Sequence, residues 1–213
     1  MRLYTYWRSS AAWRVRIALN LKGLDWQSLP VHLSRDGGEQ RQPGYLALNP
    51  QGFVPALEAD GLLLTQSLAI IEYLEETRPE PPLLPGKAAA RARVRSLALL
   101  VACDVHPLNN LRVLQYLARH AGFDETKQAD WYRHWVIEGL RALEARLASE
   151  PETGRYCHGD TPGLADCFLV PQLYNARRFG CDLEPCPTVV RIDAACGELP
   201  AFRAAAAEAQ PDA

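Results

Sequence analysis

The chain has 213 residues and a formal net charge of −2 at pH 7. This length suits one large domain or two smaller ones, and the charge argues against a basic surface that binds nucleic acid or an anionic membrane. We therefore expect a small-molecule partner, no nucleic acid and no membrane. No apolar run reaches membrane-spanning length, and Met1 leads into strand-like sequence instead of a signal segment, so we expect a cytoplasmic protein.

The first 80 residues alternate strand and helix signals. Residues 3–6 and 26–33 have extended character, and the helix predicted between them runs from Ser10 to Lys22 and ends at Gly23. After a loop at 36–44, segments 54–58 and 62–65 form a predicted hairpin around Asp60–Gly61. Ser67 then caps a helix that continues to Thr77. The order βαβ followed by ββα predicts a small mixed sheet flanked by helices.

The rest of the chain predicts a second domain. Residues 78–86, with the sequence RPEPPLLPG, cannot continue a helix, so we assign 81–87 as a stiff interdomain linker. Beyond it strand signals disappear, and helical patterns mark segments 88–120, 125–149, 165–179, 188–196 and 200–209. The predicted fold is α+β in residues 1–80 and an all-α helical bundle in residues 88–213.

The six cysteines all lie after Ala102, most of them in predicted helices. They form no C-x-x-C pair, and neither they nor the scattered histidines have the paired spacing of zinc ligands. Disulfides also belong to a secretory context that this sequence does not indicate. We expect free thiols and no metal, with a disulfide set or a zinc site as the alternatives.

Ser9 and Ser10 directly follow the first predicted strand, where the first helix begins. The unpaired backbone N–H groups at such a helix start attract anions, and a serine hydroxyl there can donate a hydrogen bond to a thiolate. A bound thiol would ionise more readily at this position than in water. The alternative is that Ser9 or Ser10 is only an N-cap, which is a common role for serine.

Two further segments favour a ligand site at this helix start. Val54–Pro55 opens a strand, where proline is tolerated, where the peptide bond can be cis and where the Val54 backbone can pair with an extended peptide. Gln66–Ser67 opens another helix, whose N–H groups and side chains suit the carboxylate and ammonium of a γ-glutamyl group. The alternatives are an ordinary edge-strand proline and an ordinary helix cap.

These segments resemble the zeta class of glutathione transferases. The similarity lies in residues 9–19 (SSAAWRVRIAL), Asn49–Pro50, Val54–Pro55 and residues 66–79 (QSLAIIEYLEETRP). It continues through residues 104–111 (DVHPLNNL) and 165–172 (ADCFLVPQ), and so covers nearly the whole chain. The resemblance implies a thioredoxin-like domain that binds glutathione, a helical substrate domain and a homodimer.

Within the class, the chain is most similar to bacterial isomerases of maleylpyruvate and maleylacetoacetate. The resemblance implies a glutathione-dependent cis–trans isomerisation, and we expect maleylpyruvate to be converted to fumarylpyruvate in the breakdown of gentisate, an aromatic compound. The alternatives are maleylacetoacetate isomerisation, a conjugating or dehalogenating transferase, and a non-catalytic module that docks partners.

This chain departs from the motif of the class at two positions. The class commonly has cysteine after the serine pair, whereas this chain has Ala11, so any mechanism must use the glutathione sulfur alone. Relatives usually have Ser or Thr where this chain has Gly163, so the reciprocal capping box with Asp166 is lost. We expect the second departure to have a small effect on stability and none on function.

The isomerisation requires a lowered thiol pKa, two held carboxylates and stabilisation of developing negative charge, because the double bond must temporarily become single through thiolate addition. Arginine suits the last two tasks through its planar fork. Arg8 immediately precedes the serine pair, and a solvated loop arginine is its alternative reading.

Arg178, near the end of the helix that starts at Ala165, is the second arginine candidate. It is in register with Asn175 and Pro171, and the family match over 175–179 favours it as a clamp for a substrate carboxylate. The alternative is a cation that complements the helix dipole beside Gly180, a role that we assign to Arg177. We read Arg14 and Arg16 as serving solvated or interdomain faces.

Residues 104–112 interrupt an otherwise apolar helix, and Pro107 should kink it. His106 and Asn110 are one helical turn apart, and the resemblance places both, with Arg112, near glutathione or substrate. His106 has a second reading as a hydrogen-bonded histidine beside a proline.

The complete set of predicted site residues has three parts. We assign catalysis to Ser9, Arg8 and Arg178, and substrate binding to Arg8, Arg112 and Arg178. Glutathione binding is assigned to Ser9, Ser10, Gln40, Val54, Gln66, Ser67, His106, Asn110 and Arg112.

Overall fold

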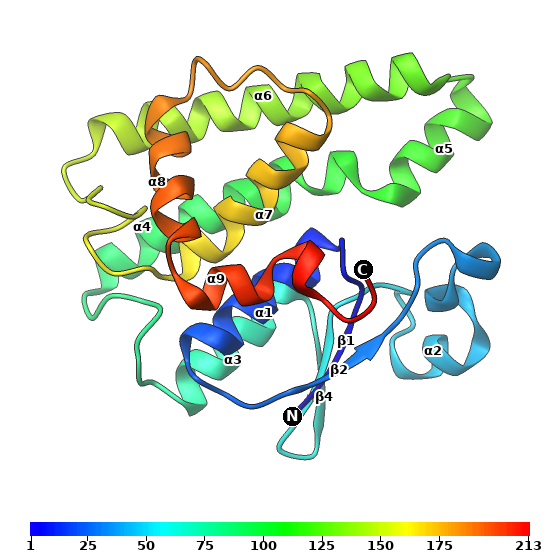
Figure 1. Cartoon of the computed structure of the whole chain (residues 1–213), viewed down its shortest axis with the longest axis horizontal. Coiled ribbons are helices and arrows are strands. Elements are labelled where there is room, and N and C mark those ends of the chain that lie inside the picture. The colour runs from blue at the N-terminus through cyan, green and yellow to red at the C-terminus, as the bar shows by residue number, and fades with distance from the viewer. The chain divides into compact units, whose positions relative to one another are not determined.

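The computed structural model describes residues 1–213, which divide into two compact units (Figure 1). The first unit consists of Met1–Leu83 together with Gly197–Ala213, and the second of Leu84–Cys196. The last residues of the chain therefore form one compact unit with its first residues.

The first unit is built on a four-stranded mixed sheet. Strand β1 (Arg2–Thr5) pairs parallel with β2 (Gln27–Pro30) and antiparallel with β3 (Ala56–Ala59), which pairs with β4 (Leu62–Thr65). The strand order is β2-β1-β3-β4, so the predicted mixed sheet is confirmed. The hairpin turn is also confirmed, because Asp60 and Gly61 have φ values of 53° and 78°, as a two-residue hairpin turn requires.

Helices cover both faces of this sheet (Figure 1). Helices α1 (Ser10–Leu21) and α3 (Ser67–Thr77) lie on one side, and α2 (Pro43–Leu48), which the sequence did not predict, lies on the other. Helix α9 (Pro200–Ala205) packs against α1. The middle of α1 is buried on all sides as a result, and Val15, Ile17 and Leu19 have no exposed surface.

The second unit is all-α, as predicted. It contains α4 (Ala88–Leu99), α5 (Leu111–Ala121), α6 (Glu125–Ser149), α7 (Leu164–Arg178) and α8 (Pro187–Gly197, whose last residue groups with the first unit). Helix α4 packs along α7. All six cysteines are free thiols, which confirms the sequence-based expectation.

The predicted helix over 88–120 is interrupted. A π-helical turn occupies Leu100–Val105, with the His106 N–H donating to the Val101 carbonyl at 2.9 Å, and a 3₁₀ turn follows at Pro107–Asn109. Pro107 has no N–H and its ring opposes a regular α-helix, which accounts for a break here. Gly139 of α6 packs against this turn so closely that a Cβ there would overlap Cγ2 of Val105.

The run Ala88–Ala121 is the one helical stretch long and apolar enough, by length and composition, to cross a membrane, which the sequence reading did not anticipate. The interruption at 100–109 divides it. Val94, Leu97, Ala98, Val101 and Val105 are buried in the bundle. These residues contribute to the core of the bundle, while 28% of the apolar window as a whole is buried.

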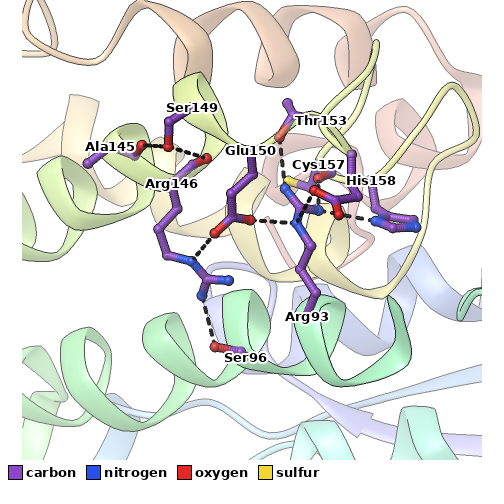
Figure 2. A network of polar contacts seen from close by, with 10 residues as sticks. Arg93, Ser96, Ala145, Arg146, Ser149, Glu150, Thr153, Cys157 and His158 are labelled. Atoms are coloured by element: carbon purple, nitrogen blue, oxygen red, sulfur yellow. Dashed lines mark hydrogen bonds and ion pairs between the residues drawn. The ribbon is translucent and has the colours of Figure 1, made fainter. Parts of the chain in front are cut away.

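Arg93 organises the loop that connects α6 to α7 (Figure 2). Its guanidinium contacts Glu150 at 2.5 Å, the Cys157 carbonyl at 2.8 Å and the Thr153 hydroxyl at 2.8 Å. Arg146 of α6 binds the other oxygen of Glu150 at 2.8 Å, and also the Ser96 hydroxyl at 2.8 Å. One carboxylate thus joins α4 to the end of α6.

Candidate active site

Ser9 is the N-cap of α1. Its Oγ accepts the Ala12 N–H at 3.3 Å, and its own N–H donates to the Tyr6 carbonyl at 2.9 Å, which fixes the turn after β1. Ser9 therefore acts as an N-cap, as the alternative interpretation stated, but capping does not prevent its hydroxyl from binding a thiolate. A hydroxyl accepts through its lone pairs and keeps one O–H donor, which is available to a thiolate at the helix start.

Ser67 lies at the start of α3, close to α1. Arg14 of α1 donates from Nη1 to Ser67 Oγ at 3.4 Å. Gln66, not Ser67 as predicted, is the cap position, and its φ of 69° is unusual for a residue other than glycine. The Gln66 amide donates to Gln51 Oε1 at 2.9 Å. The start of α3 and the Arg14 guanidinium together make an electropositive place for a carboxylate.

Val54 belongs to the buried cluster beside the first turn of α1. This cluster comprises Tyr6, Ala12, Val31, Tyr45 and Val54. The Val54–Pro55 bond is cis, as the sequence allowed. The Phe53 carbonyl accepts from Tyr45 Oη at 2.6 Å and from Asn49 Nδ2 at 2.8 Å, so the backbone before Val54 is held in place.

Gln40 is held by a closed loop that follows Val31. The His32 N–H donates to Glu39 Oε2 at 2.6 Å, and the Glu39 N–H donates back to the His32 carbonyl at 2.8 Å. His32 Nδ1 also accepts the N–H groups of Ser34 and Arg35. Gln40 is only 5% exposed, and its Nε2 donates to the Leu33 carbonyl at 3.2 Å. Its Oε1 is buried without a partner, which leaves an acceptor for a ligand N–H.

The prediction that Arg14 and Arg16 lie on solvated or interdomain faces differs from their positions in the structure. Both side chains are buried within the first unit, at 2% and 0% exposure. A sequence signal for this existed, because residues 11–19 (AAWRVRIAL) leave these arginines without a polar helix face to occupy. Arg8, in contrast, is exposed, with its guanidinium over the Trp7 ring at 5.1 Å.

The predicted residues of the second unit follow the interrupted helix. Asn110 is the N-cap of α5, where its Oδ1 accepts the Arg112 N–H at 3.1 Å. Its backbone is extended, with φ −63° and ψ 146°, so His106 and Asn110 do not share a helix face as predicted. Arg112 is exposed and His106 is half-buried. Their roles toward glutathione stay a prediction.

Arg178 is the last residue of α7. Its guanidinium lies over the Phe179 ring at 4.7 Å, and Phe179 stacks on Tyr132 of α6 with 3.6 Å between ring centroids. Burial raises the pKa of Tyr132, while the charge of Arg178 acts in the opposite direction. Arg177 pairs instead with Asp193 of α8 at 2.7 Å. Arg178 is exposed on this aromatic platform and can contact an anionic ligand.

The first unit carries seven of the predicted residues: Arg8, Ser9, Ser10, Gln40, Val54, Gln66 and Ser67. Ser9, Ser10, Gln66 and Ser67 lie at the starts of α1 and α3, and Val54 packs in the cluster that contains Ala12 of α1. Their donors and acceptors fit glutathione. Gln40 offers a buried acceptor without a partner, Ser67 and Arg14 suit a carboxylate, and Ser9 offers a hydroxyl donor to sulfur. The second unit carries the remaining four, which are His106, Asn110, Arg112 and Arg178.

Two protein-family models match the chain. The model described as the N-terminal domain of glutathione S-transferase matches residues 8–77, and the model described as the C-terminal domain of glutathione S-transferase matches residues 136–184.

Full-length relatives agree with these matches. The chain is 56% identical to a maleylacetoacetate isomerase of Pseudomonas aeruginosa over 213 residues, covering 100% of this chain and 98% of the relative. It is 53% identical to a maleylpyruvate isomerase of Ralstonia sp over 212 residues, covering 100% and 99%.

Solved structures give the same result. A holo maleylpyruvate isomerase, described as a bacterial zeta-class glutathione S-transferase, is similar with a TM-score of 0.97 and 53% identity, covering 100% of both chains. A maleylacetoacetate isomerase of Methylobacterium extorquens, with bound malonate and glutathione, has a TM-score of 0.95 and 47% identity, covering 100% of this chain and 99% of that one.

Proposed function

The chain belongs to the glutathione S-transferase family, and we propose that it is a glutathione-dependent cis–trans isomerase that converts a maleyl keto acid to its fumaryl isomer. Maleylpyruvate is the first substrate candidate, with fumarylpyruvate as the product. The maleylpyruvate isomerase with a TM-score of 0.97 over the whole of both chains supports this choice.

The geometry of Ser9 carries the chemical part of the proposal. Glutathione, when bound, supplies a thiolate that adds reversibly to the double bond and so permits rotation about it. Because Ser9 Oγ uses a lone pair to cap α1, its O–H proton can point to the sulfur position and stabilise negative charge there. The helix dipole acts in the same direction. Ala11 supplies no competing thiol.

Other side chains bind and orient the reactants. We assign the γ-glutamyl end of glutathione to Ser67, Gln66 and the nearby Arg14, and assign ligand N–H groups to Gln40 and the Val54 backbone. Ser10, His106, Asn110 and Arg112 complete the proposed glutathione set.

The substrate carboxylates are assigned to Arg8, Arg112 and Arg178, whose guanidinium groups can bind carboxylates through two parallel hydrogen bonds. The malonate bound in the Methylobacterium extorquens enzyme shows that a dicarboxylate binds to that relative, which supports this assignment.

Maleylacetoacetate is a second candidate substrate. The 56% identity with the Pseudomonas aeruginosa maleylacetoacetate isomerase favours it. The two compounds differ in the group beyond the ketone, so the choice depends on the space available for that group.

A spectroscopic assay of both substrates, with and without glutathione, tests the proposal. We expect turnover only with glutathione, no net consumption of glutathione, and a kcat lower by about tenfold or more in Ser9→Ala because one charge-assisted donor is lost. Turnover without glutathione would reject the proposed chemistry. Stoichiometric consumption of glutathione would indicate a conjugating transferase, and absence of glutathione binding by calorimetry would indicate a non-catalytic module.

We also propose that the protein is a cytoplasmic homodimer that acts in aromatic catabolism. Support for a self-association surface comes from the edge strand β4, where Leu62 is 50% exposed. Sedimentation of the full chain should give the mass of two copies, and a monomer at micromolar concentration would contradict this.

A further inference from the structure

The backbone of Trp7 is bound by two side chains from opposite ends of the sequence. The Trp7 N–H donates to Asp212 Oδ2 at 2.9 Å, and the Trp7 carbonyl accepts from Arg16 Nη2 at 2.8 Å. Asp212 is 205 positions away from Trp7 in the chain. Both backbone groups of the residue before Arg8 are therefore bound by charged side chains.

Arg16 is committed to this backbone. It has no exposed surface, and it donates also to the Tyr6 carbonyl at 3.2 Å, the Thr5 hydroxyl at 2.9 Å and the Ala205 carbonyl at 3.1 Å. Burial lowers the pKa of Arg16 to about 10, and the charge of Asp212 opposes that change. A buried guanidinium that binds backbone carbonyls restricts the positions of all the segments that it joins.

The C-terminal segment is itself anchored where it delivers Asp212. Gln210 is 7% exposed, and its Nε2 donates to the carbonyls of Ala204 at 3.0 Å and Ala206 at 2.8 Å. In Figure 1 the C-terminus lies beside β1. The carboxylate of Asp212 thus reaches Trp7 from a short, internally braced turn.

Trp7 connects this anchor to the proposed site. The Arg8 guanidinium lies over its ring at 5.1 Å, and the Tyr6 carbonyl that Arg16 binds also accepts the Ser9 N–H at 2.9 Å. We propose that Asp212 and Arg16 are a positioning pair that holds the Tyr6–Ser9 turn, so that Arg8 and Ser9 are correctly placed. The pair touches no reactant, and its effect on catalysis rests on the proposed function.

Variants at Asp212 test this pair. Asp212→Ala removes the acceptor for the Trp7 N–H, and we expect the KM for the maleyl keto acid to rise about fivefold because Arg8 loses its position. Asp212→Asn retains an acceptor oxygen and should return KM to within about twofold of the unsubstituted protein. Asp25, an exposed aspartate of the same unit, supplies matched controls, and neither Asp25→Ala nor Asp25→Asn should change KM.

A purely structural role gives a different result. Loss of stability lowers the folded fraction and hence the apparent kcat, but it leaves the KM of the folded protein unchanged. An unchanged KM in Asp212→Ala would overturn the proposal, and so would an equal rise in Asp212→Ala and Asp25→Ala.

Hydrogen exchange of the Trp7 amide, followed by NMR, gives a readout that does not depend on activity. We expect exchange to be about tenfold faster in Asp212→Ala and unchanged in Asp25→Ala. If the unsubstituted protein has no isomerase activity, the proposed function fails, while accelerated exchange at Trp7 still supports the positioning pair. Unchanged exchange would reject the pair itself.

Discussion

The charges buried in the two units differ mainly in sign, with Glu75 of the first unit as the exception. In the first unit, Arg16 and Lys22 are buried cations that bind mainly backbone carbonyls. In the second unit, Asp166 and Glu144 are buried carboxylates that accept backbone N–H groups. The sign of each charge matches the backbone group that would otherwise lack a partner.

The reason lies in the segments that these charges serve. Arg16 binds carbonyls where β1 ends, and Lys22 binds carbonyls of the proline-rich stretch after α3. In the bundle, Glu144 of α6 accepts the Thr188 and Val189 N–H groups at 3.1 and 2.9 Å, at the start of α8. Strand ends and linkers present carbonyls, whereas helix starts present N–H groups, so the sign of each of these buried charges follows the backbone groups beside it.

Lys22 provides the strongest test of this comparison, because it combines both kinds of bond. It pairs with Glu75 at 2.7 Å with no exposed side-chain surface, and donates to the Arg78 and Pro81 carbonyls at 2.7 and 3.0 Å. Lys22→Ala removes the cation beside the buried Glu75 carboxylate, which then keeps the Leu83 N–H at 3.0 Å but no opposite charge from Lys22, so we expect a loss of about 3–5 kcal/mol in the free energy of unfolding. Urea denaturation followed by circular dichroism measures it.

The double variant Lys22→Met/Glu75→Leu is the matched control. It removes both charges and keeps the volume apolar, so we expect it to recover most of the lost stability. If the double variant were as unstable as Lys22→Ala, the bonds of Lys22 to carbonyls and of Glu75 to the Leu83 N–H, and not the charge pair, would be the main contribution.

The sequence predicted those parts of the fold that local signals determine. The Asp60–Gly61 turn and the strand at Leu62–Thr65 agree with the prediction, and so do both ends of α6 at Glu125 and Ser149. In each case a positive-φ turn or a long helical periodicity is sufficient, with no distant partner needed.

The remainder depends on partners far away in the sequence. The bond from Trp7 to Asp212 joins positions 205 apart, and no local pattern indicates such a pair. The π turn at Leu100–Val105 packs against Gly139 of another helix, whereas Pro107 alone predicts only a kink. For the candidate site, sequence motifs identified the helix starts at Ser9 and Ser67. They did not identify the two buried arginines, of which Arg14 binds Ser67 and Arg16 binds carbonyls in the turn before Ser9.

Asp166 tests the other half of the comparison. Its carboxylate, 1% exposed, accepts the Cys157 N–H at 2.9 Å and the Gly163 N–H at 2.8 Å, which forms one half of a capping box. Asp166→Ala removes the acceptor of the buried Cys157 N–H and of the part-buried Gly163 N–H, and we expect a loss of about 2–3 kcal/mol in the free energy of unfolding. Thermal denaturation measures this loss. A change below about 0.5 kcal/mol would show that other acceptors replace the carboxylate.

Glu144 should give a smaller effect. Glu144→Gln retains one acceptor oxygen for the Thr188 or Val189 N–H but loses the negative charge at the start of α8. We expect a loss of about 1 kcal/mol that added salt changes little, because burial protects the Glu144 carboxylate from screening by ions. Glu138→Gln, on an exposed position of the same helix, is the control and should change stability little. Equal losses at both positions would reject a specific role for Glu144.

Glu150 should give the smallest effect, because its carboxylate binds cations near the surface and no backbone N–H. Hydrogen bonds from Arg146 and then Arg93 lower the pKa of Glu150 below its ordinary value of 4.5, whereas burial raises the pKa of Asp166. The stabilisation by Glu150 is complete above pH 4.5 and is lost as the pH falls through the lower folded-state pKa.

Asp166 binds its proton more tightly in the folded state, so acid removes no such stabilisation from it. With the Glu150 side chain 28% exposed, we expect acid to remove only about 0.5–1 kcal/mol through this carboxylate. Urea denaturation between pH 3 and pH 7 should give a flatter stability curve for Glu150→Gln than for the unsubstituted protein, roughly by that amount. Parallel curves would mean that the acid sensitivity of the second unit comes from carboxylates other than Glu150.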